Sequence, residues 1–203
     1  MFENKLIEYY NVHINLMKMF FTKNKIVIVK RYGHVPVFIS KYDKKFIKID
    51  DFDLINSSNV NNIFFYIKEG YFDFFVRLYK KCRYFPIDID VNFVDEKILN
   101  HMLYDIFVVF DKKFDNVFIV DNSNQIHKRF TILVDLGRQK ILKTIENKIK
   151  THFFKAIKKY EDHIIYAKKA VPRKIAINFN VDKFRIPYSI NYETLMPAKP
   201  LKF

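Results

Sequence analysis

Apolar side chains return at helical spacing along several stretches of the chain. The spacing predicts amphipathic helices over 2–20, 69–81, 94–110 and 136–160. The last stretch has the most regular stripe, with an apolar residue at every fourth position: Ile141, Ile145, Ile149, Phe153 and Ile157. Lysines occupy its other faces, so we expect one side to pack on the core and the other to face solvent.

Between these stretches, short runs are rich in β-branched and aromatic residues or alternate between apolar and polar positions. They predict strands over 25–32, 35–39, 46–49, 84–93, 116–120, 126–134, 174–180 and 184–190. The polar run 56–62 is predicted to be a loop, too short for a domain linker. Strands separated by single helices, without an internal repeat, indicate a single mixed α/β (α+β) domain over 1–203. We expect 1–80 to form an N-terminal helix with small strands, packed on a core formed by 81–203.

Composition favours a globular protein with a polyanionic partner. Half of the 203 residues are hydrophobic and 18% are aromatic, which is enough to build a full core. The 36 Lys and Arg outnumber the 22 Asp and Glu, and the net charge of +14 favours nucleic acid, nucleotides or an anionic membrane as partner. The single cysteine, Cys82, excludes an intramolecular disulfide framework and a multi-cysteine zinc or iron–sulfur site, and it favours a reducing compartment.

The distribution of apolar residues argues against a membrane-spanning segment. The longest apolar runs lie within 25–30 and 106–110, and they are much shorter than the roughly 20 residues that span a bilayer. The first ten residues carry acids where a secretory leader would be basic. We therefore expect an intracellular protein with no membrane partner.

An alternation of isoleucine and aspartate in the predicted strand 84–93 is the first candidate for chemistry. Because side chains alternate along a strand, Asp88 and Asp90 project from one face, about 6–7 Å apart along the chain. Two adjacent carboxylates repel unless a cation lies between them, and a pair of Mg²⁺ or Mn²⁺ ions for phosphoryl transfer fits this arrangement. The alternative is a half-exposed strand whose polar side faces water.

A polar loop that enters the predicted strand 126–134 is the second candidate. It carries Ser123, His127, Lys128 and Arg129. His127 and Arg129 share one strand face while Lys128 points the other way, so the junction can hold a triphosphate. The alternative is a structural or solvent-facing histidine. The chain has no glycine-rich phosphate loop and no Cys or His cluster with zinc spacing, which excludes P-loop, Rossmann and zinc-ribbon proteins.

A basic residue before a proline is the third candidate. Arg185 precedes Pro187, and Asp182 lies three residues before Arg185. Proline restricts the backbone, so we expect Arg185 to be a fixed cation. The alternative is a terminal strand and turn without further function.

Taken in order, these three segments resemble the small catalytic subunit of the archaeo-eukaryotic DNA primases. The family's Asp-x-Asp strand is similar to 85–90, and its Ser-Gly-x-x-Gly-x-His segment between two strands is similar to 114–127, without the glycines. Its basic residue before Pro-(Phe/Tyr)-Ser, followed by His or Asn, is similar to 185–191, the most specific match. The resemblance covers roughly 84–197. The small size and the absence of an inserted zinc module look most like the compact viral primases of the baculovirus late expression factor 1 type.

The resemblance implies a primase-like catalytic core whose central sheet carries the Asp-x-Asp strand. Asp88 and Asp90 would hold two Mg²⁺ or Mn²⁺ ions, and no zinc is expected. The family's third metal-binding Asp corresponds to a place within 173–179, which has no acid, and Asp182 is the only carboxylate nearby.

The resemblance also implies residues that bind the incoming nucleoside triphosphate. His127, with Ser123 and Arg185, would bind the triphosphate, and Arg185 would act with His127 at the catalytic centre. Because the glycines are absent, Lys128 or Arg129 can contribute to binding the triphosphate. In the predicted strand 46–49, Lys48 stands where the family has a nucleotide-contacting arginine.

The implied function is that of a DNA primase catalytic subunit, a nucleotidyltransferase that makes short primers on single-stranded DNA. The expected partners are the template and a primase large subunit or another replication protein, in the host nucleus if the source is viral or eukaryotic. The missing acid in 173–179 favours the alternative of a non-catalytic nucleic-acid-binding subunit on a degenerate primase scaffold. A metal-dependent nuclease would share the aspartate pair but does not account for the motif at 185–189.

Overall fold

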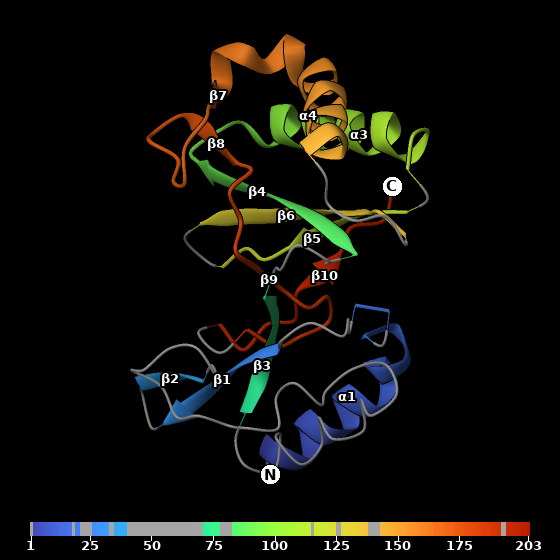
Figure 1. Ribbon diagram of the computed structural model, residues 1–203. Helices are drawn as coiled ribbons and strands as arrows, with labels where there is room; N and C mark the ends of the chain where they lie inside the picture. The colour runs from blue at the N-terminus through green and yellow to red at the C-terminus, as the bar shows by residue number, and fades with distance from the viewer. Residues whose placement is uncertain are drawn as a thin grey trace. The chain divides into compact units, whose positions relative to one another are not determined.

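The chain folds into two compact units, whose elements are labelled in Figure 1. The N-terminal unit consists of Met1–Tyr79 with Asp182–Ala198, and the second unit consists of Lys80–Val181 with Lys199–Phe203. This computed structural model describes residues 2–17, 19–20, 26–32, 35–39, 71–77, 83–114, 116–124, 127–137, 143–191 and 194–203. The expected division after residue 80 lies beside the observed one, but the segment 182–198 returns to the N-terminal unit. The expectation that the chain acts as one catalytic domain stays a prediction.

In the part of the N-terminal unit that the structure describes, helix α1 accompanies a four-stranded antiparallel sheet. Its elements are α1 (Phe2–Met17), β1 (Ile26–Tyr32), β2 (Val35–Ile39), β3 (Tyr71–Arg77) and β9 (Lys183–Arg185). The strand order is β2-β1-β3-β9. The predicted stripe of α1 is confirmed, since Leu6, Tyr10, Ile14 and Met17 are all buried.

The prediction of a helix over 69–81 is wrong, because this stretch contains strand β3. Phe72, Phe74 and Val76 are buried at alternate positions, as a strand requires. Phe75, between Phe74 and Val76, is also apolar, so the sequence shows a continuous apolar run rather than an alternation. The spacing of apolar residues in such a run does not distinguish a strand from a helix. Pairing with β1 on one side and β9 on the other fixes the extended conformation, and both partners are distant in sequence.

The second unit is built on a six-stranded mixed sheet. Its strands are β4 (Tyr84–Asn92), β5 (Val117–Asp121), β6 (Lys128–Asp135), β7 (Ile164–Ile165), β8 (Lys174–Asn178) and β10 (Lys199–Pro200). Their order is β10-β5-β6-β4-β8-β7, and neighbours are antiparallel except for the parallel pair β7 and β8. The mixed α/β class is confirmed, with the Asp-x-Asp strand β4 inside the sheet between β6 and β8.

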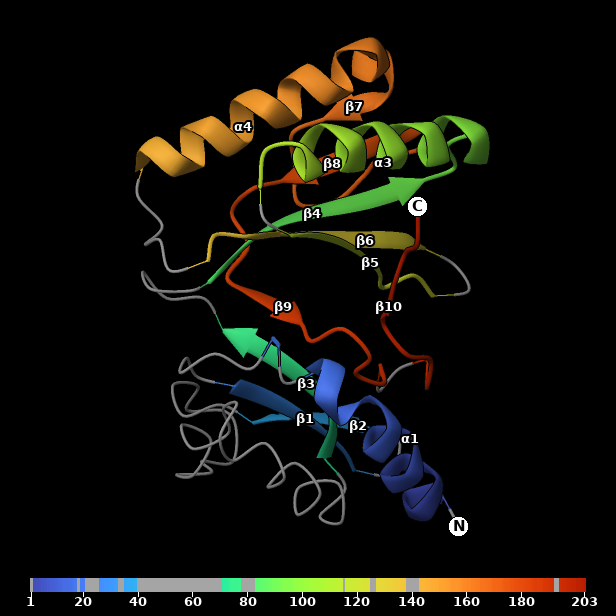
Figure 2. The same cartoon turned by 90° about the vertical axis from the view of Figure 1, so that its right-hand side faces the viewer.

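Two helices cover one face of this sheet, as Figure 2 shows. They are α3 (Glu96–Asp111) and α4 (Lys143–Ile157), which continues as the 3₁₀ helix η3 (Lys158–His163). Ile87, Ile89 and Val91 of β4 belong to the same buried cluster as the apolar faces of α3 and α4. Because side chains alternate along a strand, Asp88 and Asp90 project from the face of the sheet that these helices do not cover.

Helix ends are less well predicted than helix faces. The helices predicted over 2–20 and 94–110 are confirmed, but the one predicted over 136–160 does not begin at 136. Leu136 and Gly137 follow β6 without forming a helix, and Gly137 adopts the left-handed conformation (φ 59°) that glycine tolerates. Of the predicted stripe, Ile149, Phe153 and Ile157 are buried and Ile145 is partly buried.

The remaining predicted strands are confirmed in part. The strand predicted over 184–190 ends at Arg185, and the predictions for 46–49 and 56–62 lie outside the described residues. In the part of the chain that the structure describes, no helix is long and apolar enough to cross a membrane.

Candidate functional site

Asp88 and Asp90 each have a polar residue of a neighbouring strand directly beside them. Thr131 of β6 and Asn178 of β8 lie opposite Asp88, and Arg129 of β6 lies opposite Asp90. Both aspartates are partly buried. The sheet therefore joins three residues selected from the sequence to two others, Thr131 and Asn178, that sequence analysis did not select. Only the register between distant strands reveals these two.

A chain of two hydrogen bonds holds the Asp88 carboxylate. The Thr131 hydroxyl donates to Asp88 Oδ1 (2.9 Å), and Asn122 Nδ2 donates to the Thr131 oxygen (3.0 Å). Thr131 is only 6% exposed. A hydroxyl has one hydrogen, so a Thr131 hydroxyl that donates to Asp88 must receive the Asn122 bond on a lone pair. The amide of Asn122 thus fixes the direction in which Thr131 donates.

The second carboxylate lies beside a cation. Arg129 Nε is 3.8 Å from Asp90 Oδ1, and half of the Arg129 side chain is exposed. Lys128 instead pairs with Glu96 at the start of α3 (2.7 Å), on the helix-covered side of the sheet. This agrees with the predicted alternation and leaves Arg129 as the cation of β6 on the aspartate face.

The loop between β5 and β6 closes on itself through hydrogen bonds. Ser123 Oγ accepts from the Arg129 N–H (3.0 Å), and the Ser123 N–H donates to Asp121 Oδ1 (2.8 Å). The His127 N–H donates to Asn124 Oδ1 (2.6 Å), while the Asn124 N–H donates to the His127 carbonyl (2.9 Å). The Ser123 hydroxyl therefore fastens the loop to β6, and His127 is exposed.

Asp88 and Asp90 form a pair of carboxylates rather than a triad. Among the described residues, no group of three or more His, Cys, Asp or Glu side chains is placed to hold a metal ion. Asp182 is exposed and belongs to the N-terminal unit, so its role as a third ligand stays a prediction. The strand position beside Asp88 is occupied by Asn178, whose Oδ1 accepts from the Asn180 N–H (3.0 Å).

Arg185 of the N-terminal unit is held in a buried ion pair. Its Nε donates to Asp73 Oδ1 (2.7 Å) and its Nη2 donates to Asp73 Oδ2 (2.9 Å). The guanidinium also lies 4.8 Å from the ring centre of Phe75. Arg185 is thus the fixed cation that the sequence predicts, but Asp73, which fixes it, was not foreseen. Its nucleotide contact stays a prediction, and Lys48 lies outside the described residues.

The segment after Arg185 is anchored to α1 and β3. The Phe74 N–H donates to Ser189 Oγ (2.7 Å), and the Ile190 N–H donates to the Tyr10 hydroxyl (2.8 Å), which itself donates to the Phe72 carbonyl. Burial raises the pKa of Tyr10 far above its ordinary value, so it stays a neutral donor. The motif at 185–191 therefore has a structural role within this unit.

Comparisons with known proteins add the fold but no family. No protein-family model and no curated protein matches the chain. Among solved structures, the polymerase domain of Mycobacterium tuberculosis Ligase D in complex with DNA is similar, with a TM-score of 0.70. The match covers 98% of this chain and 80% of that one at 10% sequence identity. The chain thus has the fold of this polymerase domain.

The donor set at the aspartate face suits one kind of ligand. Mg²⁺ and Mn²⁺ prefer oxygen ligands, and Mg²⁺ is commonly bound by one or two carboxylates together with water and substrate phosphates. Asp88 and Asp90 supply two such carboxylates on the sheet face opposite α3 and α4, and Arg129 beside them can contact an anion. The residues present therefore fit a divalent cation that shares its coordination with a phosphate.

Proposed function

We propose that the protein is a nucleotidyltransferase that acts on DNA, and specifically a DNA primase catalytic subunit. The observation that carries the proposal is the pair Asp88 and Asp90 on the face of β4 that points away from α3 and α4, beside Arg129. The fold supports it, because the similar polymerase domain of Ligase D was solved in complex with DNA. The ordered motifs in the sequence favour primer synthesis on single-stranded DNA over other nucleotidyl transfers.

In the proposed reaction, a 3′-hydroxyl attacks the α-phosphate of a bound nucleoside triphosphate and pyrophosphate leaves. Asp88 and Asp90 would hold Mg²⁺ or Mn²⁺, which would supply neutralisation of phosphate charge and a more acidic attacking hydroxyl. Thr131 keeps the Asp88 carboxylate in one orientation. Arg129 offers N–H donors to a phosphate from the same face. Catalysis then rests mainly on positioning and charge neutralisation.

The exposed side chain of His127 is the proposed contact to the triphosphate. Ser123 stays a proposed contact to the triphosphate, and its hydroxyl also accepts from the backbone N–H of Arg129 in β6, which helps to set the shape of the loop. Arg185 and Asp182 belong to the N-terminal unit, and their roles in nucleotide and metal binding stay proposals.

A second candidate is a non-catalytic nucleic-acid-binding protein with the same fold. It is favoured by Asn178, a neutral side chain at the strand position beside Asp88. Binding of single-stranded DNA by such a protein would need no divalent cation and would survive loss of Asp88 and Asp90.

Incorporation of labelled nucleotides on a single-stranded DNA template in the presence of Mn²⁺ separates the two candidates. The enzyme yields short labelled products that chelation of the metal abolishes. DNA binding without any product, in the presence of a candidate large subunit as well as alone, supports the second candidate and ends the first. We expect such a partner to increase product yield.

A further inference from the structure

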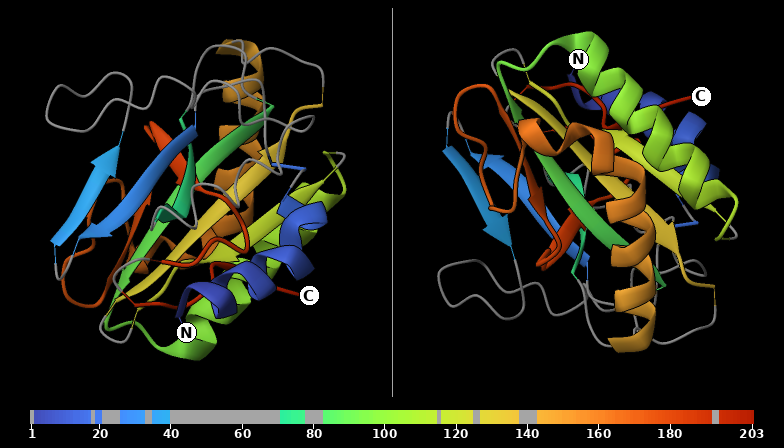
Figure 3. Two further views of the ribbon diagram at one scale, coloured as in Figure 1. Left: turned by 90° about the horizontal axis from the view of Figure 1, so that it is seen from below. Right: turned by 90° about the horizontal axis from the view of Figure 1, so that it is seen from above.

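A row of basic side chains lines the side of α4 that faces α3. Lys148, His152 and Lys155 are spaced by four and three residues, so they lie on one helix face, about 10 Å from first to last. Lys113, in the turn after α3, adds a further charge beside them, and Lys158 continues the row into η3. None of these four lysines forms an ion pair with another described residue. Figure 3 shows α3 and α4 side by side over the sheet.

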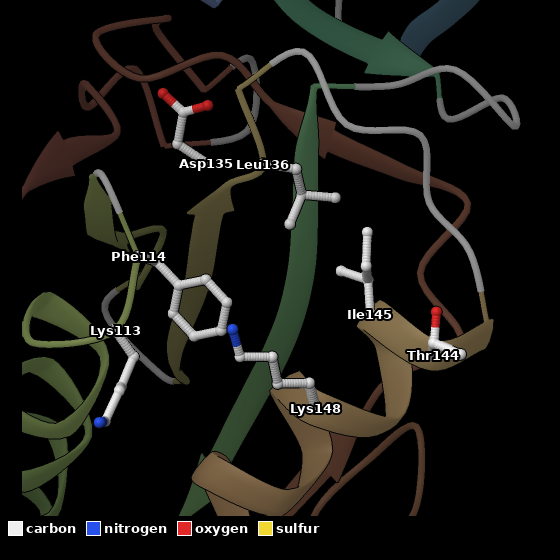
Figure 4. Close-up of a pocket in the computed structure, with 7 residues that line it drawn as sticks. All are labelled: Lys113, Phe114, Asp135, Leu136, Thr144, Ile145 and Lys148. Carbon is white, nitrogen blue, oxygen red and sulfur yellow. The ribbon is translucent and has the colours of Figure 1, made fainter.

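The crevice between the helices holds two cavities. One, of about 320 Å³, is lined by Lys113, Phe114 and Lys148 among others, and Figure 4 shows the Lys148 ammonium directed at the Phe114 ring, 5.7 Å from its centre. The other, of about 680 Å³, is lined by Tyr104 of α3 together with Lys155 and Lys158. Its one carboxylate, that of Asp105, is already neutralised by Lys159 (2.8 Å).

The cations are close enough to affect one another. Partial burial lowers the pKa of His152, and the charges of Lys113, Lys148 and Lys155 lower it further. Such crowding is unfavourable for the isolated protein, and an anion that binds among these groups would relieve it. The crevice therefore prefers a ligand with several negative charges.

We infer that the crevice between α3 and α4 binds a single-stranded nucleic acid, with phosphates along the Lys113, Lys148 and Lys155 row and bases against Tyr104 and Phe114. The crevice lies on the helix-covered side of the sheet, opposite the face that carries Asp88 and Asp90. It is thus a nucleic-acid-binding site separate from the proposed catalytic site. The inference rests on the proposed function for the choice of nucleic acid as ligand.

The aromatic residues favour a nucleic acid over an acidic peptide. Single-strand-binding grooves combine a cationic track for the backbone with aromatic rings on which bases stack. Tyr104 is 50% exposed at one cavity, and Phe114 lines the other beside Lys148. An acidic peptide would use the lysines but would gain little from an exposed tyrosine ring.

The test is the binding of the octanucleotide (dT)8 to the whole protein without metal or nucleotide, so that a failure here is distinguishable from a failure of catalysis. NMR follows the titration of His152, assigned by comparison with the His152→Gln variant. Bound phosphates should raise the pKa of His152, because they counteract the three lysines. Tyr104→Ala should lower the affinity at least about 5-fold, the scale of one lost stacked base.

A charge-matched pair of variants completes the test. Lys148→Gln combined with Lys155→Gln should reduce the slope of log affinity against log salt by about two, one for each phosphate contact. Lys168→Gln combined with Lys169→Gln removes the same charge from an exposed loop and should change the slope by less than one. The inference is overturned if (dT)8 leaves the pKa of His152 unchanged, or if the two double variants change the salt slope equally. It is also overturned if a (Glu)8 peptide shifts the pKa of His152 as much as (dT)8 does and Tyr104→Ala does not alter the affinity for the peptide.

Discussion

The guanidinium of Arg185 and the carboxylate of Asp73 form a two-pronged ion pair between residues 112 positions apart in the sequence. Asp73 is fully buried and the Arg185 side chain is 13% exposed. The pair joins β9 to β3, and it engages two of the five N–H donors of Arg185. A phosphate contact by Arg185 has to use the donors that remain.

Arg185→Ala should therefore lower the unfolding free energy of the N-terminal unit, in addition to any effect on nucleotide use. Removing the guanidinium leaves the buried Asp73 charge without its ion-pair partner, which costs about 3–5 kcal/mol of unfolding free energy. Urea denaturation followed by circular dichroism measures this loss. Lys5→Ala, which removes an exposed cation of α1, serves as the control and should cost less than about 0.5 kcal/mol. An unchanged midpoint for Arg185→Ala would refute the structural role of the pair.

Thr131→Val should weaken Mn²⁺ binding while the protein stays folded. The change removes the hydroxyl that orients Asp88, and the loss of such a support commonly costs 10–100-fold in metal affinity. Thr131→Ser keeps the hydroxyl and should retain most of the affinity. Electron paramagnetic resonance of free Mn²⁺ gives the dissociation constants. Equal affinities for the valine and serine variants would contradict this role of Thr131.

Asn178→Asp should tighten Mn²⁺ binding, since it places a third carboxylate beside Asp88. The gain is expected to be about 10-fold or more, because metal affinity depends on the number of charged ligands. Asn100→Asp on the exposed surface of α3 adds the same charge away from the site and is the control. If both variants bind Mn²⁺ like the wild type, Asn178 does not lie close enough to the metal.

The Arg83–Asp135 pair should make stability depend on acid pH. Burial disfavours the charged form of Asp135, but hydrogen bonds from Arg83, the Gly137 N–H and Asn116 outweigh it and hold the pKa of Asp135 below its usual value. Because the folded-state pKa is the lower one, the stabilisation is present above the unfolded-state pKa of about 3.9 and is lost as the pH falls through the folded-state value.

Urea denaturation of the wild type and of Asp135→Asn between pH 7 and pH 3 measures this effect. The difference in unfolding free energy between the two proteins should be largest at neutral pH and should shrink below about pH 4. Asp111→Asn at an exposed position is the control and should leave the profile unchanged. A difference that stays constant across the range would mean that the Asp135 charge does not contribute.

The sequence predicts the faces of elements better than the contacts between them. The alternation in β4 and the stripe of α4 are local patterns, and both are confirmed by burial. The helix predicted over 69–81 fails because β3 owes its extended form to β1 and β9, which contribute nothing to the local period. Long-range pairing overrides the pattern there.

The candidate site shows the same limit. Asp88 and Asp90 are recognisable from their spacing within one strand, and Arg129 from the alternation of the next. Thr131 and Asn178 become visible only through the strand register. Similarly, nothing near Arg185 in the sequence indicates that Asp73 is its partner.

The central claim is that Asp88 and Asp90 carry nucleotidyl transfer, and one assay tests it most directly. Wild type, Asp88→Asn and Asp90→Asn are compared for incorporation of labelled nucleotides on single-stranded DNA with Mn²⁺, after circular dichroism has shown that all three are folded. The account predicts Mn²⁺-dependent products for the wild type and a loss of at least about 100-fold for each variant, the scale of removing one group that stabilises the transition state. Product formation by either variant at the wild-type rate would contradict it.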